Sequence, residues 1–169
     1  KRQEVSRPGH ANMMRDEQFF REIASNCWDP EERIEEYGKA GVQVQVVSTI
    51  PVMFSYWAKA QHAADLSRFL NDHIAGLVQM YPKHYVGLCT VPMQDVDLAI
   101  SVLEEAAAQG MRGVQIGSNI NSVNLGDARF FPFYQACERL GMSMFIHPWD
   151  MMGKSDMEPV SYTHLRAHE

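Results

Sequence analysis

The sequence predicts an α/β protein with a parallel sheet. Four short runs rich in apolar and β-branched residues recur from residue 41 onward, and helix-like patterns fill the segments between them. Strands that alternate with helices at spacings of about thirty residues are typical of consecutive parallel βα units. No Gly-x-Gly-x-x-Gly motif and no phosphate-binding loop follows any of the four runs. A barrel is therefore favoured over an open nucleotide-binding sheet.

The predicted strands are short and are bounded mainly by proline and glycine. Valine, isoleucine and aromatic residues favour extended structure, whereas proline and glycine interrupt it. Short apolar runs of this kind are typical of strands that are buried on both faces of a sheet. The predicted strands are residues 42–50, 85–91, 113–117 and 143–147.

The predicted helices carry apolar residues at steps of three and four. The clearest covers residues 61–81 and stops at Pro82. A second begins at an Asp95 cap and is closed by Gly110, and a third ends before Gly141. Each helix is expected to pack one apolar face on the sheet and to leave the other face in water.

The composition is that of a single soluble domain. The chain has 169 residues, of which 46% are hydrophobic and 21% are charged, and no apolar stretch has the length of a membrane span. Its 21 acidic and 15 basic side chains form no basic patch, so we expect neither nucleic acid nor a membrane as a partner. The three cysteines lack the spacing of a zinc knuckle or a disulfide framework, which predicts reduced thiols in a cytoplasmic protein.

The segment SMFIHPWD, residues 143–150, places a histidine at the end of the fourth predicted strand. In parallel α/β folds, functional side chains gather at the carboxyl ends of the strands. Pro148 restricts the backbone of His147 to extended conformations, and Trp149 adds an apolar wall beside the imidazole. A lone histidine at a strand end is more often a hydrogen-bonded structural residue. Position alone therefore leaves open both a structural role and a metal-binding or catalytic role.

The loop after the first predicted strand carries three aromatic residues, Phe54, Tyr56 and Trp57. They either pack over the mouth of the barrel or form the wall of a substrate pocket, since such pockets are mostly apolar. The sequence alone does not choose between these two roles.

Arg21 interrupts an apolar segment that precedes a helix start at Asp29-Pro30. Its simplest role is that of a solvated or salt-bridged side chain. Arginine is also the usual residue for gripping a carboxylate through two parallel hydrogen bonds, so Arg21 is a candidate substrate-binding residue.

Four motifs resemble, in order and spacing, the zinc-dependent decarboxylases of the amidohydrolase superfamily that act on 2-amino-3-carboxymuconate 6-semialdehyde. The motifs are residues 26–31, 48–59, 113–117 and 147–151. The resemblance runs from about Phe19 to Met152, and the long Pro-Val-Met-Phe-Ser-Tyr-Trp motif is specific.

The resemblance implies a (β/α)8 TIM barrel that holds one divalent metal, usually zinc, at the carboxyl ends of its strands. It implies that His147 is one of four metal ligands, that Arg21 contacts a substrate carboxylate, and that Trp149 lies beside the pocket. The implied activity is decarboxylation in the kynurenine branch of tryptophan catabolism. The implied partners are a small carboxylate substrate and a second subunit of a homodimer.

The sequence departs from the family pattern at both ends. The His-x-His pair of the first strand, the catalytic histidine and the late aspartate ligand have no match, so the resemblance assigns no catalytic residue to this chain and only about strands two to five of the barrel. We therefore expect residues 1–158 to be part of an amidohydrolase-type barrel domain and residues 159–169 to be a non-native tail. On this interpretation His164 and His168 are not a metal site.

Three functional hypotheses follow from the resemblance. In the first, the parent protein is this decarboxylase and the chain is an internal part of it. In the second, the parent protein is another decarboxylase or a hydrolase of the superfamily. In the third, the chain of 169 residues is inactive alone, because half a barrel exposes two sheet edges and lacks most of its metal ligands.

Overall fold

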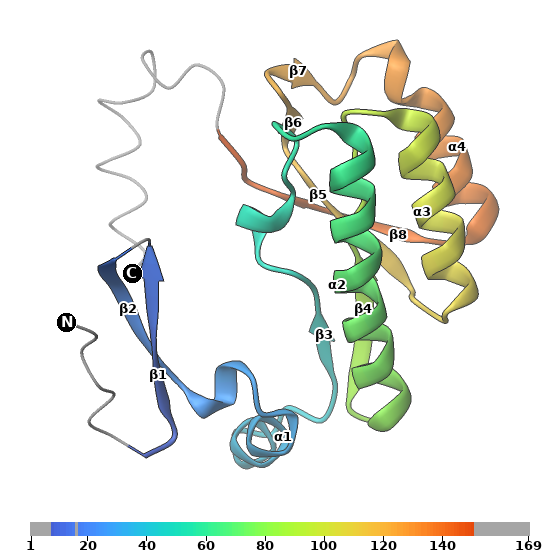
Figure 1. Cartoon of the computed structure of the whole chain (residues 1–169). Coiled ribbons are helices and arrows are strands. Elements are labelled where there is room, and N and C mark those ends of the chain that lie inside the picture. Colours follow the sequence, from blue (N-terminus) through green and yellow to red (C-terminus); the bar gives the residue numbers. More distant parts are fainter. Residues whose placement is uncertain (1–7, 16, 151–169) are drawn as a thin grey trace, which may run out of the picture. The chain divides into compact units, whose positions relative to one another are not determined.

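The computed structural model describes residues 8–15 and 17–150, and the chain divides into two compact units, residues 1–45 and 46–169. The first unit contains a hairpin followed by a helix (Figure 1). Its elements are β1 (His10–Arg15), β2 (Gln18–Ala24), the short 3-10 helix η1 (Ser25–Cys27) and α1 (Pro30–Lys39).

The start of α1 follows from its sequence. The Asp29 side chain accepts hydrogen bonds from the backbone N–H groups of Glu31 and Glu32, at 2.9 and 3.2 Å. These bonds satisfy donors that the first turn of a helix leaves without partners, and Pro30 needs no such partner because it has no N–H. The predicted helix start is therefore confirmed.

The second unit is built on a four-stranded sheet in the order β3-β4-β5-β8. The pairs β4–β5 and β5–β8 are parallel. The strands are β3 (Gln45–Val47), β4 (Tyr85–Cys89), β5 (Gly113–Gly117) and β8 (Ser143–His147). The predicted α/β class with a parallel sheet is confirmed.

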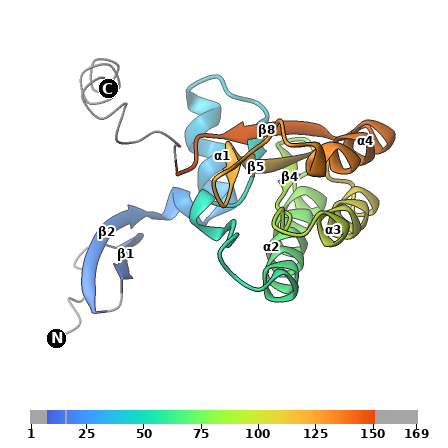
Figure 2. The same cartoon turned by 90° about the horizontal axis from the view of Figure 1, so that it is seen from above.

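One helix follows each of the first three strands. These are α2 (Ala60–Met80), α3 (Val96–Ala108) and α4 (Phe131–Leu140), and the connections also carry η2 (Pro51–Met53), β6 (Asn119–Ile120), β7 (Val123–Asn124) and η3 (Ala128–Phe130). Helix α2 contacts α3, and α3 contacts α4. Figure 2 shows these three helices gathered on one side of the sheet. Consecutive βα units with all helices on one face are the arrangement of a (β/α)8 barrel wall.

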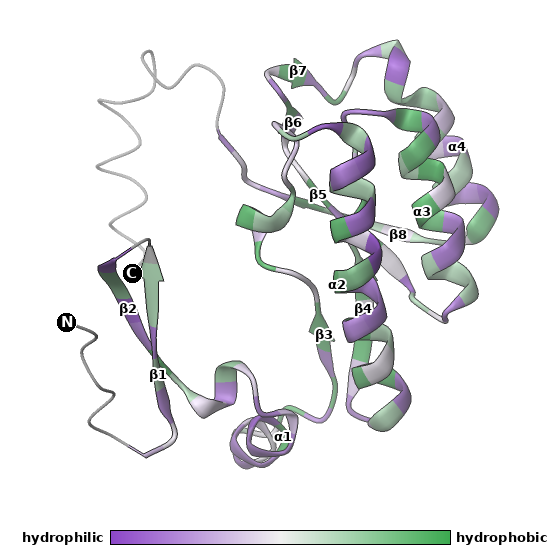
Figure 3. Cartoon of the chain, viewed as in Figure 1, coloured by the Kyte–Doolittle hydropathy of each residue, from purple (hydrophilic) through white to green (hydrophobic). Residues whose placement is uncertain are grey.

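The three helices have one apolar face each, as their sequence patterns predict. Figure 3 shows green and purple residues alternating along α2 and α3. The buried positions of the three helices include both small and large side chains. The fully buried positions include Ala64, Ala99, Leu103, Val114, Ile116 and Phe133. No helix among the described residues is both long and apolar enough to span a membrane.

Two predicted strands are longer in the sequence pattern than in the structure. Strand β4 ends at Cys89 because the backbone of Thr90 bonds to a side chain instead of a strand: its N–H donates to Asn71 Oδ1 at 2.8 Å, and its C=O accepts from Asn71 Nδ2 at 3.0 Å. The run at residues 42–50 forms a strand only over Gln45–Val47. It is the outermost strand of the described sheet order, so one neighbour supports it instead of two.

The helix caps agree with the sequence predictions. Asp95 accepts a hydrogen bond from the backbone N–H of Leu98 at 3.1 Å, which begins α3. Gly141 ends α4 with a φ of 63°, a left-handed conformation that glycine adopts at low cost.

We expect Asn71→Leu to destabilise the chain by about 2 to 4 kcal/mol, because it leaves the buried N–H and C=O of Thr90 without partners. Urea unfolding followed by far-ultraviolet circular dichroism measures this change. Gln109→Leu is the matched control, because it removes a carboxamide of similar chemistry from an exposed position. Equal stability of the two variants would contradict the role given to Asn71.

Candidate functional site

His147 is the last residue of β8 and pairs in register with Gly117, the last residue of β5. Its side chain is half-buried, and its ring nitrogen Nδ1 lies 2.7 Å from the carbonyl oxygen of Pro148. A carbonyl oxygen can only accept, so Nδ1 carries the hydrogen and donates it. In the neutral ring the other nitrogen, Nε2, then keeps its lone pair, which is the form in which an imidazole binds a metal.

The turn after His147 is held by two residues that follow β5. Ser118 Oγ accepts a hydrogen bond from the backbone N–H of Trp149 at 3.0 Å and donates to the carbonyl oxygen of the same residue at 3.1 Å. Asn119 Nδ2 donates to the carbonyl oxygens of Trp149 and Asp150, at 2.7 and 3.0 Å. We call these hydrogen bonds from Ser118 and Asn119 the clamp. Asp150 has a φ of 36°, so the clamp fixes a backbone conformation that an L-residue rarely adopts.

The clamp itself rests on a buried side chain. Asn119 is 3% exposed, and its Oδ1 accepts a hydrogen bond from the backbone N–H of Ser122 at 3.1 Å. The carboxamide thus uses both its oxygen and its nitrogen. A buried amide with both ends paired is a rigid support.

An aromatic cluster of Phe54, Tyr56 and Trp149 packs beside the clamp. The rings of Phe54 and Tyr56 are stacked with centroids 5.3 Å apart, and Trp149 meets Phe54 edge-on at 5.5 Å. The Tyr56 hydroxyl accepts a hydrogen bond from the backbone N–H of Gly117 at 3.0 Å, and burial raises the pKa of that hydroxyl. A Cβ atom at Gly117 would lie 3.1 Å from Trp149 Cβ, so the close approach of Trp149 favours glycine there.

The structure separates the three aromatic residues of the loop after β3. Phe54 is 1% exposed and Tyr56 is 3% exposed, so both belong to the packed interior. Trp57 is 83% exposed. Packing, rather than a pocket wall, is the observed role of the first two residues.

Arg21 lies in β2 of the first unit and is exposed. Its guanidinium carbon is 5.9 Å from the centroid of the Phe20 ring. Within residues 8–15 and 17–150, Arg21 forms no salt bridge with a carboxylate. The guanidinium is therefore not committed to a carboxylate of the described chain.

The described residues contain no group of three or more His, Cys, Asp or Glu side chains that could hold a metal ion. His147 is thus a single candidate ligand, with its nitrogen lone pair prepared by the bond to Pro148. The chemistry of this imidazole fits zinc or another divalent transition metal, while the rest of a ligand set is not supplied by this part of the chain. His164, His168 and the proposed tail at residues 159–169 lie outside the described residues.

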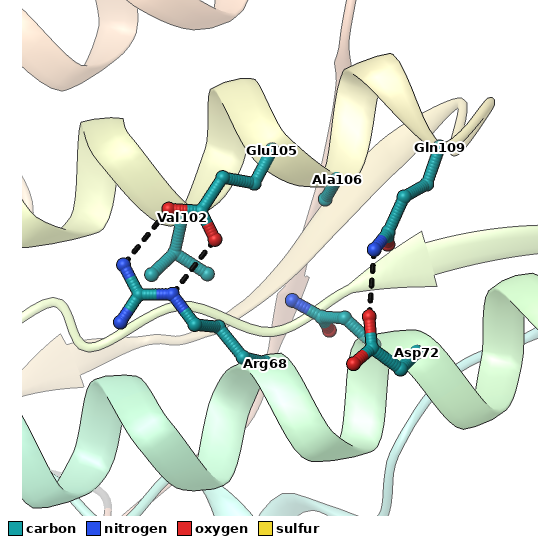
Figure 4. Close-up of a pocket in the computed structure, with 7 residues that line it drawn as sticks. Arg68, Asp72, Val102, Glu105, Ala106 and Gln109 are labelled. Atoms are coloured by element: carbon teal, nitrogen blue, oxygen red, sulfur yellow. Dashed lines mark hydrogen bonds and ion pairs between the residues drawn. The ribbon is translucent and has the colours of Figure 1, made fainter.

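Two cavities in the second unit are small. One, of about 110 Å³, lies between α2 and α3 (Figure 4). Arg68 donates two hydrogen bonds to Glu105 there, at 2.7 and 2.8 Å, and Gln109 donates to Asp72 at 2.6 Å. The other, of about 100 Å³, lies beside residues 93–96 and 120–130. Neither approaches the roughly 300 Å³ of a typical small-molecule pocket.

A parallel sheet whose consecutive βα units place their helices on one face defines the class of (β/α)8 barrel proteins. The comparison with protein families agrees with this class: the amidohydrolase family model matches residues 9–165. The chain belongs to the amidohydrolase family.

The curated relatives include a 2-amino-3-carboxymuconate-6-semialdehyde decarboxylase from Dictyostelium discoideum. It is 52% identical to this chain over 148 residues, which are 87% of this chain and 41% of that protein. The chain spans less than half the length of the curated relatives that it matches. The resemblance stated from the sequence motifs is therefore confirmed.

Solved structures confirm the barrel as the fold to which this sheet belongs. The 5-carboxyvanillate decarboxylase from Sphingomonas paucimobilis is similar with a TM-score of 0.69 and 28% identity, over 78% of this chain and 39% of that chain. The 5-carboxyvanillate decarboxylase from Novosphingobium aromaticivorans, solved with manganese, is similar with a TM-score of 0.69 and 25% identity, over 79% of this chain and 38% of that chain.

The supports of the site were not predicted from the sequence. The motif at residues 147–151 points to His147 and Trp149, but not to Ser118 or Asn119, which hold the turn after His147. Asn119 is about thirty residues away from that turn in the sequence, as expected for neighbouring strands of a βαβ unit. The sequence signal that could have indicated them is the polar pair Ser118-Asn119, which directly follows the end of the strand at Gly117.

We expect Asn119→Asp to destabilise the chain by about 2 to 3 kcal/mol, because a carboxylate facing two carbonyl oxygens loses both donated hydrogen bonds. Urea unfolding monitored by tryptophan fluorescence measures this change. Asn124→Asp is the matched control, because Asn124 uses only its oxygen, which accepts from the N–H of Gly126 at 2.8 Å. A neutral effect at both positions would show that the clamp does not hold the turn.

Proposed function

We propose that the protein containing this chain, at the length of its relatives, is a divalent-metal-dependent decarboxylase of 2-amino-3-carboxymuconate 6-semialdehyde. The observation that carries the proposal is the 52% identity to the Dictyostelium decarboxylase over 87% of the chain. The prepared lone pair of His147 at a strand end supports the metal requirement. Zinc is the proposed metal, in a homodimeric cytoplasmic enzyme of tryptophan catabolism.

In this proposal His147 supplies one ligand through Nε2. A divalent cation bound through this ligand would supply Lewis-acid chemistry toward the substrate. The clamp from Ser118 and Asn119 keeps the imidazole in place, since it fixes the backbone directly after His147. A fixed ligand costs less entropy on binding than a mobile one.

Trp149 and Arg21 are the proposed substrate contacts. Trp149 is half-buried, and its indole is held edge-on against Phe54, so it offers a fixed apolar surface beside His147. Arg21 is proposed to grip a substrate carboxylate by two parallel hydrogen bonds. Its lack of a carboxylate partner among the described residues supports that role.

A second candidate is decarboxylation of an aromatic acid such as 5-carboxyvanillate. The observation that favours it is the structural similarity to the two 5-carboxyvanillate decarboxylases, at 28% and 25% identity. The larger identity to the Dictyostelium protein favours the first candidate. Both candidates use a divalent metal and release carbon dioxide.

We expect the gene product at the length of its relatives to decarboxylate 2-amino-3-carboxymuconate 6-semialdehyde and not 5-carboxyvanillate, and to lose activity on metal removal. We expect the chain of 169 residues to show neither activity nor a tight stoichiometric zinc site, because the described residues supply one ligand. Absorbance of the substrate and calorimetric zinc titration measure these outcomes. Faster turnover of 5-carboxyvanillate would select the second candidate.

We expect Arg21→Ala to lower kcat/KM of that gene product by about 10- to 100-fold, because a bidentate hydrogen bond to a carboxylate is lost. The metal content is expected to stay the same. Arg21→Lys keeps the charge but not the two-pronged geometry and should recover only part of the loss. Arg112→Ala is the control for removal of an exposed arginine. Equal kinetics in Arg21→Ala and Arg112→Ala would remove Arg21 from the substrate site.

A further inference from the structure

The hairpin of β1 and β2 (Figure 1) carries one extra residue in its second strand. Met13 of β1 pairs with Arg21 of β2. The next residue of β1, Met14, pairs with Phe19. Phe20 therefore has no counterpart in β1 and is the additional residue of a β-bulge. Bulges of this kind re-aim side chains, because two residues of one strand then oppose a single residue of the other.

The bulge brings the aromatic ring of Phe20 to the guanidinium of Arg21. Consecutive residues of a regular strand point to opposite faces of the sheet, so their side chains do not meet. Here the guanidinium carbon of Arg21 lies over the Phe20 ring, 5.9 Å from the ring centroid. This distance is within the range of a cation–π interaction, in which the electron-rich face of a ring attracts a cation. The two side chains thus form one unit on the hairpin.

This unit is exposed and has room for a ligand. Phe20 is 62% exposed, and Arg21 is exposed as well. Among the residues that the structure describes, Arg21 has no carboxylate partner. Attraction to a ring restrains a guanidinium without giving its N–H donors an oxygen acceptor. The contact with Phe20 therefore orients Arg21 and leaves it able to bind a carboxylate.

Phe19 lies on the other face of the hairpin and provides a matched comparison. It pairs with Met14, which directly follows Met13 in β1 and so points away from the face of Met13. Arg21 pairs with Met13 and shares its face. Phe19 and Phe20 are thus neighbouring, exposed phenylalanines, of which only Phe20 contacts the guanidinium.

We propose that Phe20 is a positioning residue for the substrate carboxylate: its ring holds the Arg21 guanidinium in the orientation that grips the carboxylate by two parallel hydrogen bonds. A mobile arginine side chain loses rotamer freedom when it binds a carboxylate, and this loss weakens binding. A guanidinium that a ring already restrains loses less, so the carboxylate binds more tightly. The inference rests on the substrate contact given to Arg21 in the proposed function and requires no metal ligand.

The test is KM and kcat of the gene product, at the length of its relatives, for the carboxylate that it decarboxylates. Phe20→Leu keeps an apolar side chain but removes the ring, and we expect KM to rise about 2- to 5-fold with kcat unchanged. Phe20→Tyr keeps a ring and is expected to retain the KM of the unsubstituted protein. Phe19→Leu, the same substitution on the opposite face of the same strand, is expected to change neither constant.

A double-mutant cycle separates positioning of Arg21 from direct contact between Phe20 and the substrate. If the ring acts through the guanidinium, Phe20→Leu has no further effect on KM in a protein that already carries Arg21→Ala. An equal rise of KM in both backgrounds would overturn the positioning role. An unchanged KM in Phe20→Leu, or a KM in Phe20→Tyr as high as in Phe20→Leu, would overturn it as well.

Failure of this inference is distinguishable from failure of the proposed function. A rise of KM in Arg21→Ala without one in Phe20→Leu would refute only the role of Phe20. Turnover of 5-carboxyvanillate instead of the proposed substrate would refute that substrate, while the same variants still decide the role of Phe20, because both compounds are carboxylates. An unchanged KM in Arg21→Ala, or turnover of neither compound, would refute the substrate contact of Arg21 and the role of Phe20 together.

Discussion

The hydrogen bonds from Asn119 to the carbonyl oxygens of Trp149 and Asp150 are the constraint on which the candidate site depends. They connect the residues after β5 to the turn after β8, so the ends of two neighbouring strands become one unit. The edge-on packing of Trp149 against Phe54 adds the loop after β3 to the same unit. Three connections that are distant in the sequence thus hold one histidine at one angle.

The same region shows why aromatic residues in the motif at residues 48–59 occur together with a glycine in the motif at residues 113–117. The backbone N–H of Gly117 donates a hydrogen bond to the Tyr56 hydroxyl. Strand β4 has already ended at this level, because the backbone of Thr90 is hydrogen-bonded to Asn71. Side chains replace strand pairing at the carboxyl end of the sheet. This replacement opens the end of the sheet for polar groups without leaving backbone donors unpaired.

The inner and outer strands of the sheet differ in their burial. Val114 and Ile116 of β5 are 0% exposed, whereas Phe145 and Ile146 of β8 are 52% and 50% exposed. Strand β8 has one neighbour in the described sheet, and β5 has two. Family membership and the length of the relatives agree with a sheet that continues in the barrels of those proteins.

The sequence by itself determined the local structure of this protein. Capping residues such as Asp29 and Asp95, the three- and four-residue steps of the helices, and the short apolar strands are encoded by neighbours in the chain, so the α/β class and most element ends were predictable. Only the tertiary structure decided strand lengths and the supports of the site. Asn71 shortens β4 and Asn119 holds Trp149 through contacts between residues that are far apart in the sequence. No local pattern specifies which distant backbone group a buried amide will bind, because that choice depends on how the strands align.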